Sequence, residues 1–217
     1  MAEYAKKGAF LSWLDCGIIV YVGCDTNYMC IVQHACGQLA VAGYRFKNAI
    51  FDLSIVNESS VIQDEIHERV LRSFRKHQHA INYLRTIQSS HSTYLCICIG
   101  LVMVTFSVTL VKIASVSEIS GESIRDIVFL SSQLTHIFLL TVQGQFVQNA
   151  NDEVTESIYD ALWYNANNKT KLLFVLALRN CLNPPTLSAG GLVILNLKSF
   201  SEIIKSSVSY FTVLKST

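Results

Sequence analysis

The sequence has little charge for its length. Of its 217 residues, 15% are charged and 51% are hydrophobic, whereas about 25% of the residues in ordinary soluble domains are charged. The formal net charge is only +1, so the chain lacks the basic field that binds a nucleic-acid backbone. These two shortages favour a membrane protein and argue against nucleic acid as a partner.

Turn-forming residues and catalytic signatures are also scarce. Two prolines and ten glycines suit long helices better than many short strands, so we predict an all-α fold. The seven cysteines include no Cys-x-x-Cys pair and imply no disulfide framework. There is no GxSxG, HExxH, P-loop or GxGxxG motif. The closest histidine pair, His77 and His79, would point to different sides of a helix. We therefore expect no enzymatic activity, no cofactor and no metal site.

Long uncharged runs predict membrane helices, which need about 20 mostly apolar residues. We predict spans at 13–44, 93–116 and 127–150. The second span is apolar on every face over 94–111, whereas polar side chains in the third should face protein or water rather than lipid. The first is interrupted only by Asp25 and then runs on into the aqueous phase.

The C-terminal region predicts a broken element. Asn183-Pro184-Pro185 and Gly190-Gly191 separate two apolar stretches. A proline pair removes two amide donors and disfavours helix at the preceding residue, so one continuous helix is not expected. The last stretch, 199–217, contains charges, yet its apolar and polar residues fall on opposite helical faces. It is therefore predicted to be a membrane helix with one wet side.

The distribution of basic residues predicts the orientation. The segment 45–92 is rich in lysine and arginine and contains a helix, starting near Ser60, that should continue into the second span; 117–126 is nearly free of them. By the positive-inside tendency, 45–92 and the segment 151–198 are cytoplasmic. Residues 1–12, the loop 117–126 and the C-terminus are then extracellular.

Several motifs in the second half of the chain resemble, in order and spacing, the C-terminal signature of insect odorant receptors. They are Gly144-Gln145, Glu156-Ser-Ile-Tyr159 with Trp163-Tyr164, Lys171 to Arg179, Pro185 to Gly190, and Phe200 to Leu214. Upstream, Gln33 to Leu39, Arg45 and Arg75-Lys76-His77-Gln78 resemble the family's fourth helix and the cytoplasmic stretch after it. The resemblance implies an integral membrane helical bundle, a fragment of a seven-helix receptor channel that lacks the first three helices.

Members of that family form heteromeric cation channels with a shared co-receptor. The resemblance therefore implies an odorant receptor that acts in the sensory perception of smell, as one subunit of an odorant-gated cation channel. Its expected place is the plasma membrane of olfactory sensory neurons, which it would cross several times. Its expected partners are a volatile odorant, the co-receptor in a tetramer, and the lipid bilayer. Two alternatives stay open: a non-channel membrane receptor or interaction protein, and an inactive truncated receptor.

The resemblance also implies site residues. The last half-helix would line the pore, with a hydrophobic gate at Val213 between Ser209 and Thr217, because a ring of apolar side chains can close a pore by dewetting. The odorant-pocket candidates on the first and third spans are Cys16, Val20, Ser132, Gln133 and His136. The subunit-interface candidates near the cytoplasmic half-helix are Tyr159, Trp163 and Arg179. Ordinary packing is the alternative for each set.

Overall fold

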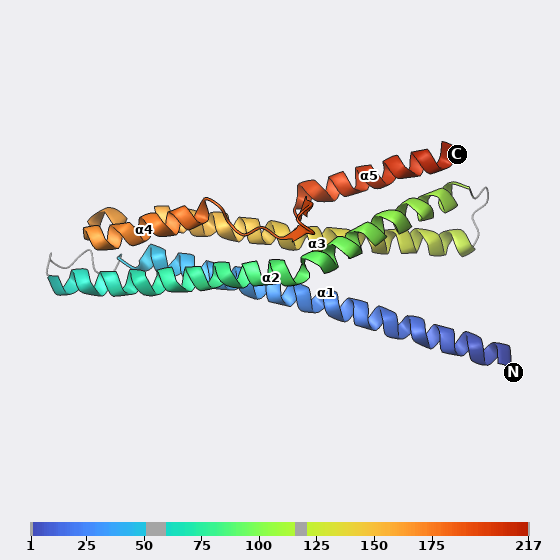
Figure 1. Ribbon diagram of the computed structural model, residues 1–217, viewed down its shortest axis with the longest axis horizontal. Helices are drawn as coiled ribbons and strands as arrows, with labels where there is room; N and C mark the ends of the chain where they lie inside the picture. The colour runs from blue at the N-terminus through green and yellow to red at the C-terminus, as the bar shows by residue number, and fades with distance from the viewer. Residues whose placement is uncertain (1, 51–59, 116–120, 217) are drawn as a thin grey trace.

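The chain forms an elongated bundle of helices (Figure 1). The computed structural model describes the backbone of residues 2–50, 60–115 and 121–216, and side-chain surroundings for 22–50, 60–115 and 121–215. Its elements are α1 (Ala2–Asn48), α2 (Ser60–Ala114), α3 (Gly121–Tyr159), the 3₁₀ turn η1 (Trp163–Asn165), α4 (Asn168–Cys181), β1 (Ser188–Ala189), β2 (Val193–Ile194) and α5 (Leu197–Ser216). The predicted all-α fold is confirmed, with one short β-hairpin that was not foreseen.

A seam of buried residues with heptad spacing joins the three long helices. One series of buried positions of α3 alternates in steps of four and three: Gln133, Ile137, Leu140, Gly144, Val147, Asn151, Val154 and Ile158. The same spacing recurs in α1 from Tyr28 to Phe46 and in α2 from Ile66 to Ile87. A repeat of 3.5 residues keeps one face of each helix toward its partners. We call these positions the heptad seam.

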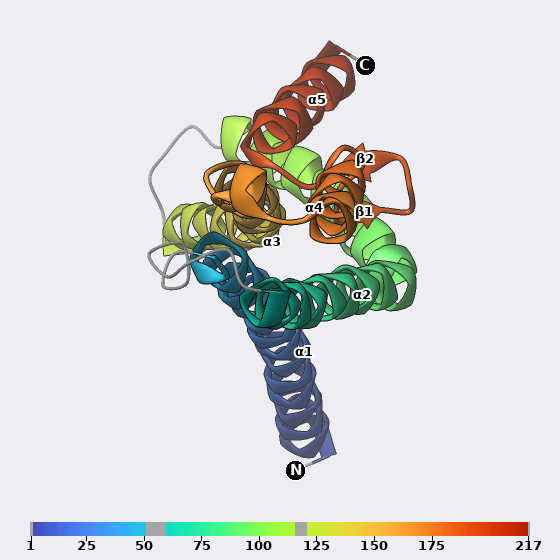
Figure 2. The same cartoon turned by 90° about the vertical axis from the view of Figure 1, so that its left-hand side faces the viewer.

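At one end of the bundle, α4 lies beside α2 and α3 (Figures 1 and 2). Three buried rings meet there: the centroid of Phe46 lies 5.7 Å from that of Phe174 and 6.1 Å from that of His77. The Sγ atom of Cys181 lies 3.8 Å from Nε2 of His77. These side chains join α1, α2 and α4 in the predicted cytoplasmic region.

At the other end the helices diverge, and both termini lie there (Figure 1). The end-on view shows α1 and α5 leaving the bundle in different directions (Figure 2). By length and apolar composition, α2 and α3 can each cross a membrane. That α1 also spans the membrane stays a prediction, as does the assignment of the cytoplasmic and extracellular sides.

Two helices extend further than the predicted spans. The helix predicted from Ser60 does run on into the second span, because α2 is continuous over 55 residues. In contrast, the loop predicted at 117–126 is wrong for its second part, because α3 already begins at Gly121. The charges near that start are tolerated since they are paired: Oδ2 of Asp126 lies 2.6 Å from Nζ of Lys112 on α2. α3 also runs past the predicted end of its span, to Tyr159.

The predicted break between two C-terminal helices is present, since α4 ends at Cys181 and α5 begins at Leu197. Each of these helices starts at an asparagine cap. The side chain of Asn167 accepts a hydrogen bond from the amide of Thr170 at 2.9 Å, and that of Asn196 accepts one from the amide of Ser199 at 2.8 Å. Such caps satisfy amides that the first helical turn leaves without partners. Each half-helix therefore has its own defined beginning.

The β1–β2 hairpin between the half-helices is fixed to α2 and α3. The Gln88 side chain accepts a hydrogen bond from the Ser188 amide at 2.6 Å and donates one to the Ser188 carbonyl at 3.1 Å. The turn itself uses Gly190 and Gly191, whose φ angles of 60° and 72° favour glycine. On α3, Gly144 lies so close to Leu195 that a Cβ atom would overlap the Leu195 carbonyl. We call these contacts the hairpin clamp.

We predict that Gly144→Ala destabilises the bundle by roughly 1–3 kcal/mol, because the new methyl group must push the backbone after β2 away from α3. Thermal unfolding of the purified chain in detergent measures the change. Gly23→Ala is the matched control, since a Cβ atom at this helical glycine meets nothing within 4 Å. Equal melting temperatures for the two variants would contradict the close contact.

His77 gives a pH prediction. Burial lowers its pKa to about 4 from an ordinary value of 6.5. As the pH falls below 6.5, the unfolded chain binds a proton at this imidazole while the folded chain does not. The free energy of unfolding is therefore highest above pH 6.5 and falls by about 3 kcal/mol at most as the pH drops toward 4. His77→Gln should flatten the fall in melting temperature over this range. His79→Gln, at an exposed position of the same helix, should leave the fall in melting temperature unchanged. If both variants keep the pH profile of the parent protein, the prediction fails.

Candidate functional site

A buried polar cluster joins the three long helices inside the predicted membrane region. Asp25 on α1 is buried, and its Oδ2 atom lies 2.8 Å from Nε2 of His136 on α3. The Tyr94 hydroxyl on α2 donates to Asp25 Oδ1 at 2.9 Å. A carboxylate among apolar helices is costly unless it is paired and hydrogen-bonded. Asp25, Tyr94 and His136 satisfy one another across three helices, and we call them the intramembrane cluster.

Polar contacts continue along α3 on either side of His136. The Gln133 side chain donates to the Thr105 hydroxyl of α2 at 2.8 Å. Toward the other end, the Gln33 side chain of α1 donates to Gln143 Oε1 at 2.9 Å. The prediction that polar groups of the third span face protein is therefore confirmed for Gln133, His136 and Gln143.

The odorant-pocket candidates do not all come together. Gln133 is buried and His136 is half-buried, and both point toward neighbouring helices. Ser132 is exposed, and its hydroxyl donates to the Phe129 carbonyl of its own helix. Cys16 and Val20 lie outside the described side chains, so nothing tests them.

Asp25 and Tyr94 were missed as site residues by sequence reasoning. A signal for Asp25 was available, because it is the acidic residue that interrupts the first apolar run, and intramembrane carboxylates mark functional or paired positions. The sequence carries no such signal for Tyr94, because tyrosine is common at the ends of membrane-spanning helices. Its role depends on the register between α1 and α2.

The last helix is packed on one face only. Ile203 and Ser207 are buried against the bundle, and the Ser107 hydroxyl of α2 donates to the Ser207 carbonyl at 3.0 Å. Small side chains at this contact let the two helices approach closely. On the other side Ser209 is exposed, and Val213 is 59% exposed. Thr217 lies outside the described residues.

Between α2 and α5 lies an apolar groove of about 490 Å³. Its lining includes Met103 and Val104 from α2 and Tyr210, Val213 and Leu214 from α5. The outer end of α5 is thus less tightly held than its beginning, where Ser199 is buried beside its asparagine cap.

The subunit-interface candidates lie at the surface. Tyr159 is 70% exposed, and Trp163 packs edge-on against Tyr164 with centroids 6.2 Å apart. On α4, Arg179 is exposed, and two exposed apolar residues, Leu172 and Val175, precede it at helical spacing. Aromatic, arginine and apolar side chains of this kind are enriched at protein interfaces.

Among the residues that the structure describes, no group of three or more His, Cys, Asp or Glu side chains could hold a metal ion. The described cysteines are free thiols. What the fold and the polar cluster define is a helical membrane protein with a broken, half-packed C-terminal element.

Comparison with known proteins identifies the family. The family model described as "7tm Odorant receptor" matches residues 12–208, which is most of the chain. The chain therefore belongs to the seven-transmembrane odorant receptor family, as the resemblance of its motifs indicated.

Individual relatives are distant in sequence. Odorant receptor 22c of Drosophila melanogaster is 20% identical over 92% of this chain and 50% of the relative. Odorant receptor 13a of the same fly is 21% identical over 99% of this chain and 53% of the relative. The chain spans about half the length of these relatives.

A solved structure shares the fold. The insect olfactory receptor OR5 from Machilis hrabei, solved in complex with eugenol, superposes with a TM-score of 0.68 over 88% of this chain and 46% of that protein, at 14% identity. At this identity the match establishes the helical membrane fold alone.

We predict a coupling free energy of about 1–3 kcal/mol between Asp25 and His136 in a double-mutant cycle with alanine at each position, because each single change leaves a buried polar group without its partner. Denaturant unfolding in detergent measures it. Lys47 and Asp160 form a matched, exposed pair at 3.2 Å, which should couple by less than about 1 kcal/mol. Additive effects at Asp25 and His136 would contradict a shared cluster.

Proposed function

We propose that the chain carries the pore helix of an odorant-gated cation-channel subunit that works with a shared co-receptor in the sensory perception of smell. Its proposed place is the plasma membrane of olfactory sensory neurons. Membership of the odorant receptor family supports a receptor role rather than an enzymatic one. The observation that carries the channel proposal is the one-sided packing of α5.

A pore helix needs one face against its own subunit and another face free for the conduction path. α5 has this arrangement, with Ile203 and Ser207 buried, Ser209 on the exposed side, and Val213 more than half exposed at the open groove beside α2. In a symmetric assembly of four subunits, four such exposed faces meet around a central axis. A ring of Val213 side chains there excludes water when it is narrow and conducts when it widens, which is a hydrophobic gate.

The odorant would bind on the membrane side of α1 and α3. Gln133 and His136 support this because contacts with neighbouring helices hold both polar side chains in fixed positions inside the bundle. Ligand sites of this kind are mostly apolar with a few well-placed polar groups. We place Asp25 and Tyr94 beside them as positioning residues that fix the His136 ring. The structurally similar receptor OR5 from Machilis hrabei was solved with eugenol bound. A small, partly polar aromatic compound of that type suits such a pocket.

Assembly with the co-receptor would use the outer face of α4. Leu172 and Val175 are each more than half exposed and lie on one side of α4 with Arg179. Tyr159 and Trp163 add two exposed aromatic side chains shortly before α4 begins. A patch of this composition is typical of an interface between subunits.

Current recordings from cells that express the complete gene product with the co-receptor test the channel proposal. We expect Val213→Ala to raise the current without odorant several-fold, because a smaller side chain weakens a dewetting gate. Val208→Ala is the matched control, since Val208 is also exposed on α5 but points to a different side of the helix.

An unchanged basal current and unchanged ion selectivity in Val213→Ala would contradict the gate. Odorant-evoked signalling that persists in cells without any current would instead favour a receptor that is not a channel.

A further inference from the structure

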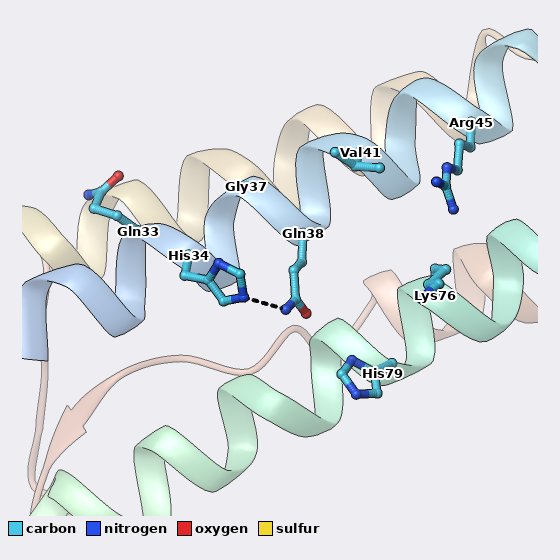
Figure 3. A pocket seen from close by; sticks show the side chains of 8 residues that line it. All are labelled: Gln33, His34, Gly37, Gln38, Val41, Arg45, Lys76 and His79. Atoms are coloured by element: carbon cyan, nitrogen blue, oxygen red, sulfur yellow. Dashed lines mark hydrogen bonds between the residues drawn. The ribbon is translucent and has the colours of Figure 1, made fainter.

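A basic groove lies between α1 and α2 (Figure 3), and its lining includes no residue of α5 or of the intramembrane cluster. It has a volume of about 590 Å³ and is lined by α1 residues from Gln33 to Arg45 and by Lys76 and His79 of α2. Figure 3 shows the Arg45 side chain extending from α1 toward α2, where Lys76 lies. None of the lining residues is acidic.

Arg45 and Lys76, the arginine and lysine of the groove, have no acidic partner within 4 Å among the residues that the structure describes. Within the described residues, the basic partners in ion pairs are Lys47, Arg69, Lys112, Arg125 and His136. Arg45 and Lys76 take part in none of these pairs. A concave surface that carries two free cations and no carboxylate attracts anions and concentrates them.

Neutral donors complete the lining. His34 and Gln38 are joined by a 2.8 Å hydrogen bond, and the His34 ring packs edge-on against Tyr83 of α2 with centroids 6.0 Å apart. These contacts hold the imidazole and the amide at one end of the groove, with Arg45 at the other end (Figure 3). The guanidinium group of arginine matches two phosphate oxygens at once, and lysine adds a compact positive charge.

The basic surface continues beyond the groove. Arg45 also lines a second hollow of about 410 Å³ with Arg69 and Arg72. The nearby carboxylate of Glu65 is engaged by Arg69 at 2.7 Å. Arg45 therefore lines both hollows, and none of the described residues in either lining is acidic.

We propose that this groove binds a phosphate-bearing polyanion, either the phosphorylated headgroup of an inositol lipid or a soluble phosphate compound such as a nucleotide. Its volume lies within the range of small-ligand sites, about 300–1,000 Å³. Gly37 and Val41 line the wall between the polar end at His34 and Gln38 and the basic end at Arg45, where the ring of such a compound would lie. The site goes beyond odorant gating, and only its cytoplasmic location rests on the orientation proposed above.

Binding to the purified complete gene product tests the proposal. The soluble arm titrates inositol 1,4,5-trisphosphate and, separately, ATP into protein in detergent. The lipid arm reconstitutes the protein into nanodiscs that contain phosphatidylinositol 4,5-bisphosphate, or phosphatidylserine at equal total charge, and counts bound lipids by native mass spectrometry. The Arg45→Gln/Lys76→Gln variant should weaken binding about tenfold or more, because each cation supplies charge-assisted hydrogen bonds.

The matched control is Arg75→Gln/Arg85→Gln, which removes the same charge from exposed positions of α2 outside the groove and should change binding less than about twofold. A selective loss in the soluble arm supports the site with a free phosphate as its ligand. A selective loss in the lipid arm alone supports it with a headgroup as its ligand. Absence of binding in both arms, or an equal loss in both double variants, overturns the proposal. Odorant-evoked current with the co-receptor, recorded separately, distinguishes this failure from failure of the channel assignment.

Discussion

The heptad seam determines how α1, α2 and α3 pack against one another. Because buried residues recur every four and three positions in α1, α2 and α3, the three helices are locked in one rotation and one register. That register brings Asp25 opposite both Tyr94 and His136, although these residues are far apart in the chain. His77 is a polar member of the seam, and a shifted register would separate its buried ring from Phe46 of α1 and Cys181 of α4.

The broken C-terminal element is attached to the long helices at its middle. The hairpin clamp attaches the link between α4 and α5 to α2 through Gln88 and to α3 through Gly144. α4 is therefore part of the packed end of the bundle, whereas α5 is held firmly at its start and loosely at its exposed end. A helix with a fixed base and a half-packed tip suits an element whose outer part changes position during gating. The basic groove uses a different part of α2, at Lys76 and His79.

Much of the fold could be read from the sequence, because long uncharged runs, the proline pair and the change from an apolar to an amphipathic pattern are local signals. The α2 helix running through 60–114 and the break before α5 follow from such patterns. The intramembrane cluster could not be read in full, since Tyr94 and His136 acquire their roles only when the helix register is known. The same holds for Gly144: its motif was recognised, but its contact with Leu195 belongs to the tertiary structure. The pore, pocket and interface assignments remain proposals because they depend on surfaces that partners would complete.

The proposed function requires that the exposed face of α5 lines an ion-conduction path. A cysteine scan along α5, with a charged thiol reagent applied to the complete gene product and its co-receptor during odorant-evoked current, measures this directly. We predict block at Ser209 and Val213 and no block at the buried positions Ile203 and Ser207, each relative to the unsubstituted parent. Block that follows no helical face, or no block at any position while the current persists, would contradict it.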